Sequence, residues 1–104
     1  MEMFTYKGYK GCFFSDGRYR DNGNRALEII NHAEGPIATV TVNPGEPVEN
    51  DCIAVKNYSE NAGMLDFLRD NGIVGETVRV INSGWVEIPV CRLTEKGLEI
   101  FGED

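Results

Sequence analysis

Cys52, its neighbour Asp51 and the single histidine, His32, are the residues best suited to covalent chemistry. A cysteine nucleophile needs a base that takes its proton and a third group that orients the base, so a Cys-His-Asp site is formally available. Cys52, however, lies in an apolar segment typical of a core strand, where a free cysteine behaves as a small hydrophobic side chain. No local motif assembles a nucleophile, a base and oxyanion donors. We therefore predict that the protein is not an enzyme.

Metal-binding patterns are equally weak. Three cysteines and one histidine could complete a zinc tetrahedron, but no pair of them has the spacing of about two to four residues found in zinc knuckles. Glu46, Glu49 and Asp51 could bind calcium, but they lack the alternating ligand spacing of an EF-hand loop, and two prolines stiffen the segment. We expect no metal and no cofactor.

Aromatic and basic side chains are mixed near the N-terminus, a composition found in nucleic-acid-binding surfaces. They are Tyr6, Tyr9, Phe14 and Tyr19, with Lys7, Lys10, Arg18 and Arg20. Residues 6–25 contain five cations and two acids, a local balance of +3. Aromatic residues at alternating strand positions are more often core residues, and the net charge of −7 repels nucleic acid. Direct nucleic-acid binding is therefore not expected.

The rest of the chain is strongly acidic. From Ala26 onward, fourteen carboxylates stand against five basic side chains, a balance of −9. Such a surface repels nucleic acid and membrane headgroups and favours a basic protein surface as its partner. Carboxylates on a rigid scaffold can also imitate phosphates, so the protein could occupy the basic groove of a nucleic-acid-binding enzyme.

Trp85, the only tryptophan, directly follows a turn glycine. In that position it is either a half-exposed anchor for a partner or a buried residue of a sheet. Together with the acidic side chains it completes the set of predicted partner-binding residues: Glu46, Glu49, Asp51, Glu60 and Trp85.

The clearest helix is predicted over about residues 60–71. Apolar residues recur there with the spacing of one buried helix face, at Met64, Leu65 and Leu68. Ser59 is the expected N-cap, and Asn71 with Gly72 supplies a left-handed end.

The remaining segments predict strands and turns. The expected strands are residues 4–6, 10–14, 25–31, 37–42, 52–55, 77–81 and 85–93. Residues 15–24 and 43–51 are expected to be exposed loops, and residues 82–84 a hairpin turn. Pro89 predicts that the last strand runs at an edge of the sheet or carries a bulge. A short segment of the tail, residues 94–104, is expected to pack against the rest of the domain. The predicted fold class is α+β, a mainly antiparallel β-sheet with one principal α-helix packed on one face.

Length and composition predict one domain, residues 1–104, because 104 residues with 41% hydrophobic content suffice for a single core. No apolar run approaches the roughly 20 residues that span a bilayer, and the start MEMFTYKGYK has no signal-peptide pattern. We expect a cytoplasmic protein. The three cysteines, Cys12, Cys52 and Cys91, cannot form a closed disulfide framework and are expected to be reduced and mostly buried.

Several segments together resemble a small uncharacterised family of bacteria, phages and conjugative elements, domain-of-unknown-function family 4313. They are an ALEI strand, ATVTVN with its Pro/Gly/acid loop, KNYSENAGML, the GIV exit and GWVEIPVCRL. The likeness runs from about Leu27 to Leu93 and is most specific at KNYSENAGML. The resemblance implies an α+β domain carried on mobile DNA, and it supplies no catalytic residues.

Charge and resemblance lead to two function hypotheses. The first is a small acidic protein-binding module of a phage or mobile element, of which a counter-defence inhibitor of the anti-CRISPR or antirestriction type is one form. The alternative is a non-enzymatic accessory or structural protein of a phage or plasmid, homodimeric through an exposed sheet edge, whose acidity serves solubility.

Overall fold

The chain folds into two antiparallel sheets and two short α-helices, which confirms the α+β class. The structure is a computed structural model and describes residues 3–102. Its strands are divided between a four-stranded and a three-stranded sheet, whereas the sequence predicted a single main sheet.

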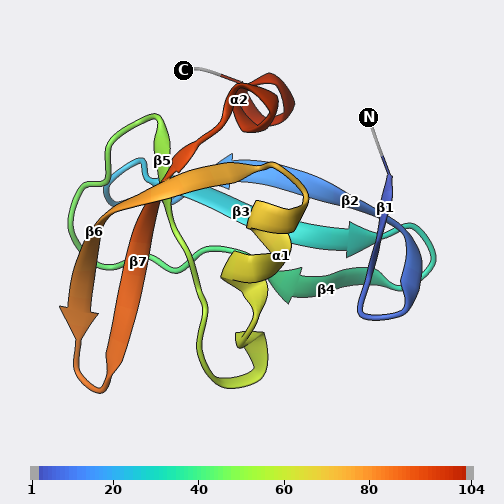
Figure 1. Ribbon diagram of the computed structural model, residues 1–104, viewed down its shortest axis with the longest axis horizontal. Helices are drawn as coiled ribbons and strands as arrows, with labels where there is room; N and C mark the ends of the chain where they lie inside the picture. The colour runs from blue at the N-terminus through green and yellow to red at the C-terminus, as the bar shows by residue number, and fades with distance from the viewer. Residues whose placement is uncertain (1–2, 103–104) are drawn as a thin grey trace.

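The first sheet is an N-terminal meander in the order β1-β2-β3-β4 (Figure 1). Its strands are β1 Phe4–Tyr6, β2 Tyr9–Arg18, β3 Arg25–Asn31 and β4 Gly35–Thr39. The N-terminal hairpin and the strand over residues 25–31 are confirmed. The loop was predicted to begin at residue 15, which is wrong, because β2 continues to Arg18. Every residue of β2 from Cys12 to Arg18 is paired with a residue of β3.

β4 ends three residues before the predicted end of its strand, at residue 39 instead of 42. The reason is that Thr41 and Val42 turn away to pair with the end of β5 and with Val55. The Val42 N–H donates to the Ala54 carbonyl, and Thr41 forms a bridge with Val55. This short stretch therefore connects the two sheets.

The second sheet has the order β5-β7-β6 and consists of β5 Cys52–Ala54, β6 Val74–Ser83 and β7 Val86–Leu93. β7 is the middle strand, so the edge position, the first alternative predicted from Pro89, is wrong. The second alternative, a bulge, agrees with the structure, because the register between β6 and β7 shifts between Thr77 and Arg79, opposite Cys91 and Val90. The Pro89 carbonyl accepts from the Val55 N–H, just past the end of β5. In an antiparallel strand the N–H and the carbonyl of one residue face the same neighbour. A backbone N–H at position 89 would therefore face the side on which β5 has already ended, so proline is tolerated there.

The principal helix, α1 Met64–Asp70, is shorter than predicted. Ser59 is not its N-cap, because Ser59 begins a separate 3₁₀ turn, η1 Ser59–Asn61, at φ 54°. Gly63 at φ 95° separates the two helices, and the Asn57 Oδ1 accepts from the Leu65 N–H in the first turn of α1. The predicted end is confirmed, since Gly72 has φ 69°.

The tail forms a second helix, α2 Glu95–Phe101, whose N-cap Thr94 accepts from the Gly97 N–H at 3.0 Å. Docking of the tail is thereby confirmed for this helix, and residues 103–104 of the predicted segment lie outside the described residues.

Leu68 and Met64 of α1 are buried in a core that contains residues of both sheets and of α2, whereas Leu65 and Phe67 are half-buried against it. A second cluster, which includes Cys52, lies within the three-stranded sheet. All three cysteines are buried and free, as predicted. Within residues 3–102, no helix is long and apolar enough to cross a membrane.

Candidate functional site

Residues 43–51, the acidic loop, carry three of the five predicted partner-binding side chains and are held rigidly. Asn24, buried at the end of the β2–β3 loop, fixes the loop backbone with both ends of its amide. Its Nδ2 donates to the Glu46 carbonyl at 2.8 Å, and its Oδ1 accepts from the Val48 N–H at 2.8 Å. The loop is thus exposed but well ordered by its contacts.

Two arginines at the facing ends of β2 and β3 contribute to the same clamp. Arg25 is buried, and its guanidinium donates to the Asn50 carbonyl at 2.7 Å and to the Gly102 carbonyl at 2.7 Å. Arg18 donates to the Asn50 Oδ1 at 2.9 Å. Arg18 and Arg25, two of the five cations of residues 6–25, therefore hold the acidic loop in place, and Arg25 also holds the end of α2.

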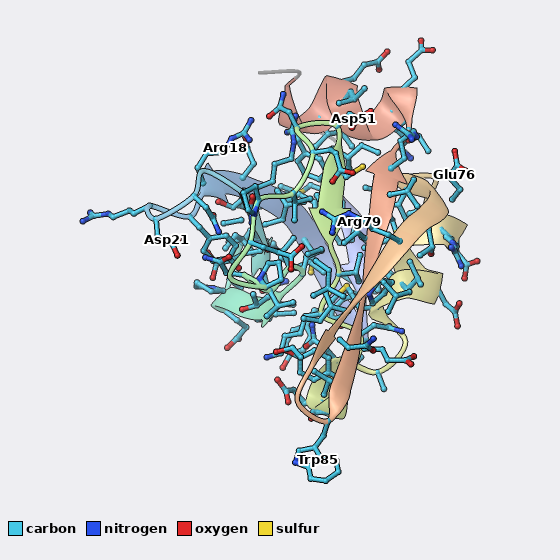
Figure 2. The ribbon with its side chains drawn as sticks, turned by 90° about the vertical axis from the view of Figure 1, so that its left-hand side faces the viewer. Arg18, Asp21, Asp51, Glu76, Arg79 and Trp85 are labelled. Atoms are coloured by element: carbon cyan, nitrogen blue, oxygen red, sulfur yellow. The ribbon has the colours of Figure 1, made fainter. Side chains whose placement is uncertain are left out.

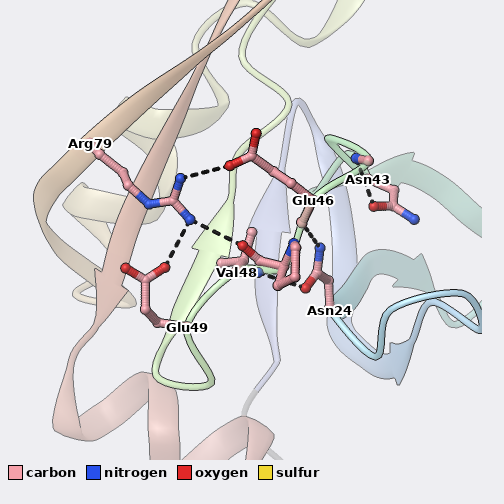
Figure 3. Close-up of polar contacts among 8 residues, drawn as sticks. Asn24, Asn43, Glu46, Val48, Glu49 and Arg79 are labelled. Carbon is pink, nitrogen blue, oxygen red and sulfur yellow. Dashed lines mark hydrogen bonds and ion pairs between the residues drawn. The ribbon is translucent and has the colours of Figure 1, made fainter.

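Two arginines of the second sheet bind the carboxylates of the acidic loop. Arg79 on β6 reaches Glu46 at 3.1 Å and Glu49 at 3.0 Å, opposite to the side on which Asn24 lies (Figure 3). Arg92 on β7 reaches Asp51 at 2.7 Å. The hydrogen bond from Arg79 lowers the pKa of Glu49. The Cys52 thiol, and after it Arg92, lower the pKa of Asp51.

These ion pairs change what the acidic loop can do. These three carboxylates and Glu76 share the Arg79 and Arg92 guanidinium groups, so four negative charges meet two positive ones and a net charge of −2 remains. A partner that used the loop carboxylates as phosphate mimics would compete with Arg79 and Arg92. The remaining net charge can attract a basic surface at long range, whereas each carboxylate of the loop is already paired.

Glu60, the fourth predicted acid, lies in η1 and pairs with Lys56 at 2.9 Å, which lowers the pKa of Glu60. Glu60 therefore has a different ion-pair partner from the carboxylates of the acidic loop, which bind arginines of β6 and β7. The structure therefore divides the predicted residues into separate places, and in Figure 2 Asp51 and Trp85 lie at opposite ends of the molecule.

Trp85 is the most exposed large hydrophobic side chain of the described residues, at 103% of its reference accessibility. It belongs to the two-residue loop Gly84-Trp85 between β6 and β7, so the turn begins two residues later and ends one residue later than the predicted turn at residues 82–84. Gly84 has φ 60°, as the first residue of a type II′ turn requires. Figure 2 shows the indole extending from the end of the hairpin into solvent. The alternative of a buried tryptophan is wrong.

Beside Trp85 lies a shallow hollow of about 550 Å³, which sequence reasoning missed. Its lining combines aromatic, aliphatic and polar side chains, chiefly Trp85, Tyr58, Val80, Pro89, Asn57 and Glu87. Val80 is itself half exposed. The only sequence signal was the tryptophan after a turn glycine, because Asn57 and Tyr58 lie far before the hairpin residues in the chain and only the fold brings them together.

The candidates for catalysis are not assembled. Cys52 begins β5, whereas His32 follows β3 and lies against Gly11 in the other sheet. Burial, and then the hydrogen bond to Asp51, raise the pKa of Cys52 to about 11, which keeps the thiol protonated at neutral pH. Within residues 3–102, no group of three His, Cys, Asp or Glu side chains is arranged to hold a metal ion.

The mixed aromatic and basic residues of the N-terminus do not form one stacking surface. Tyr6 and Phe14 are buried in the core, and the Tyr19 hydroxyl forms a hydrogen bond with Thr41 Oγ1 at 3.2 Å. Tyr9 is exposed. Stacking of successive bases needs several exposed rings in a row, which these residues do not supply.

No protein family, curated protein or solved structure matches this chain. The resemblance to domain-of-unknown-function family 4313 therefore remains a hypothesis.

Proposed function

We propose that the protein is a small acidic, non-enzymatic protein-binding module that contacts its partner through Trp85. The full exposure of this indole at the end of a projecting hairpin carries the proposal. Large aromatic side chains dominate the binding energy of protein interfaces when they enter a partner's pocket, whereas exposed to water they contribute nothing to stability. The raised pKa of the Cys52 thiol supports a role without catalysis.

The partner presents a basic surface. The net charge of −7 supports this choice, since complementary charge accelerates encounter and suppresses wrong partners. The acidic loop, with Glu46, Glu49 and Asp51, and Glu60 contribute to the attracting field, and Trp85 makes the close contact.

In its specific form, the proposal is a counter-defence inhibitor of the anti-CRISPR or antirestriction type. Such a protein is carried by a phage or another mobile element, works in the cytoplasm of the bacterial host and occupies the basic groove of a nucleic-acid-binding defence enzyme. The acidity of the chain and the resemblance to family 4313 support this form.

The test is affinity capture from a host lysate with three immobilised proteins: the wild type, Trp85→Ala and Tyr9→Ala. Tyr9 is an exposed aromatic residue of the other sheet and serves as the matched control. We expect a basic, nucleic-acid-binding protein to be retained by the wild type and by Tyr9→Ala and lost with Trp85→Ala. Equal retention by all three proteins would contradict a contact through Trp85.

A second candidate function, a homodimeric accessory or structural protein of a phage or plasmid, is favoured by the position of β6. β6 is an end strand of its sheet, and Val80 on it is 49% exposed. The unpaired backbone groups of an end strand can pair with a second copy. Sedimentation equilibrium distinguishes the two candidates, because a dimer would support this one and a monomer at the highest soluble concentration would remove it.

A further inference from the structure

We propose that the hollow beside Trp85 binds an extended, proline-containing segment of the partner that carries a lysine or arginine. This inference rests on the proposed function and deepens it, because it states the chemistry of the bound segment.

The lining of the hollow has the composition that polyproline recognition needs. A polyproline II segment has no internal hydrogen bonds, exposes its backbone carbonyls and packs its rings into grooves between aromatic side chains. Here the Trp85 and Tyr58 rings come from two separate segments, and Val80 of β6 and Pro89 of β7 belong to the same lining. The indole at the turn, the tyrosine ring of the neighbouring segment and the two apolar strand residues offer several contacts to such a ligand.

Hydrogen-bond donors are also available at the hollow. The Trp85 indole N–H, the Tyr58 hydroxyl and the Asn57 amide can each donate to a backbone carbonyl. Among the residues that the structure describes, none of these three donors is used. The Asn57 Oδ1 is occupied by the Leu65 N–H at 2.9 Å, which fixes its side chain. The Asn57 amide is thus held in place before binding, which lowers the cost of using it as a donor.

Charge selects the flanking residue of the ligand. Glu87 is the only charged side chain in the lining of the hollow, and it forms no ion pair with a described residue. Lys56, whose ammonium lies 6.0 Å from the centre of the Tyr58 ring, is itself paired with Glu60. A cation on the ligand would therefore find Glu87 unpaired.

The neighbouring end strand offers a competing mode, in which an extended peptide of any sequence adds to β6 as a further strand. A polyproline ligand separates the two modes because proline has no N–H and cannot sustain a ladder. Binding of a proline peptide therefore reports recognition in the hollow alone.

The experiment is a titration of the full chain with three synthetic peptides of equal length: nine prolines followed by arginine, nine alanines followed by arginine, and nine prolines followed by glutamate. Trp85 is the only tryptophan, so its emission reports directly on the hollow. We expect a saturable blue shift with the proline–arginine peptide and at least tenfold weaker binding of the other two.

The variant Glu87→Lys should reverse the preference between the arginine and glutamate peptides, while Glu99→Lys, an exposed residue of α2, should leave it unchanged. Circular dichroism checks that both variants fold. A response to the alanine peptide equal to that of the proline peptide, or none to any peptide, would overturn the inference. So would an unchanged preference in Glu87→Lys.

Failure of this inference is distinguishable from failure of the proposed function. If Trp85→Ala abolishes capture of the partner and no proline peptide binds, the binding module stands and its polyproline ligand is refuted. If the proline peptide binds while capture survives Trp85→Ala, the proposed function is refuted.

Discussion

Leu68 is the side chain on which the position of α1 between the sheets most depends, and Leu68→Ala tests that packing. Leu68 is 0% exposed and belongs to the core shared by both sheets. The substitution removes three carbon groups, which at about 0.8 kcal/mol each gives about 2.4 kcal/mol of lost transfer energy. A cavity that does not collapse adds to this loss, so the expected cost is about 2–5 kcal/mol.

A loss of this size is a large part of the 5–15 kcal/mol that typically stabilises a domain. It should lower the melting temperature by roughly 10 °C or more, at about 4–8 °C per kcal/mol for a domain near this size. Urea unfolding should be followed by far-UV circular dichroism, because Trp85 is already fully exposed in the folded state and its fluorescence is a poor reporter of unfolding.

Leu65→Ala is the matched control, since it deletes the same atoms from the same helix at a half-buried position. We expect it to cost less than half as much as Leu68→Ala. If both substitutions cost the same, or if Leu65→Ala costs more, the face of α1 assigned to the core is wrong.

Three further predictions concern groups whose environment the structure defines. Cys52, with its pKa raised to about 11, should react slowly with iodoacetamide in the folded protein and rapidly in urea, as peptide mapping would show, and Cys52→Ser should lower the melting temperature without loss of partner binding. Arg25→Ala leaves partly buried carbonyls of the acidic loop and of the end of α2 without this donor, so it should cost about 1.5–3 kcal/mol and speed hydrogen exchange in α2; unchanged exchange would contradict the clamp. The pKa values of Glu49, Asp51 and Glu60 are lowered in the folded state, so the stability that they contribute is complete above their ordinary values of 4.5, 3.8 and 4.5 and is lost as the pH falls through the lower folded values. The melting temperature should therefore be level from pH 7 to about pH 5 and fall below about pH 4, and a fall that begins above pH 5 would point to other groups.

The sequence patterns within a segment were sufficient to predict those strands and helix ends whose stabilising contacts are close in sequence. The strand over residues 25–31 was predicted with its observed bounds from the β-branched pair Ile29-Ile30 and the turn that follows it, and in the structure every second residue of this strand is buried. The start of α1 was not predicted. Ser59 has the chemistry of an N-cap, but Gly63 at positive φ intervenes, and the side-chain oxygen that accepts in the first turn comes from Asn57.

The candidate site depends on contacts between distant segments, which single-sequence patterns do not contain. Arg79 lies 33 residues from Glu46 and 30 from Glu49, so the sequence showed an acidic loop without its counter-charge. Arg25 was counted with an exposed basic segment, although its partners at the end of α2 lie 76 and 77 residues away. Trp85 was recognised as a candidate from its place after a glycine, whereas the hollow beside it needed the fold.

The separation of the acidic loop from Trp85 predicts that charge and aromatic contact control different rate constants of partner binding. Charges that attract at a distance raise the association rate and lose their effect as salt shortens the Debye length to about 10 Å at 0.1 M. A buried aromatic anchor acts after encounter, so Trp85→Ala should accelerate dissociation, by about 30-fold if it removes the roughly 2 kcal/mol of an interface hot spot.

The acidic loop is tested with Glu46→Gln and Glu49→Gln together, because lysine at these positions would face Arg79 and displace the loop. The matched control, Glu95→Gln with Glu99→Gln, removes the same two charges from the exposed surface of α2. If the loop acts only through the field, both pairs should slow association in low salt and leave dissociation unchanged in stopped-flow measurements. If the loop pair alone accelerates dissociation, Glu46 and Glu49 touch the partner, and the contact extends along the sheet from Trp85 towards the acidic loop.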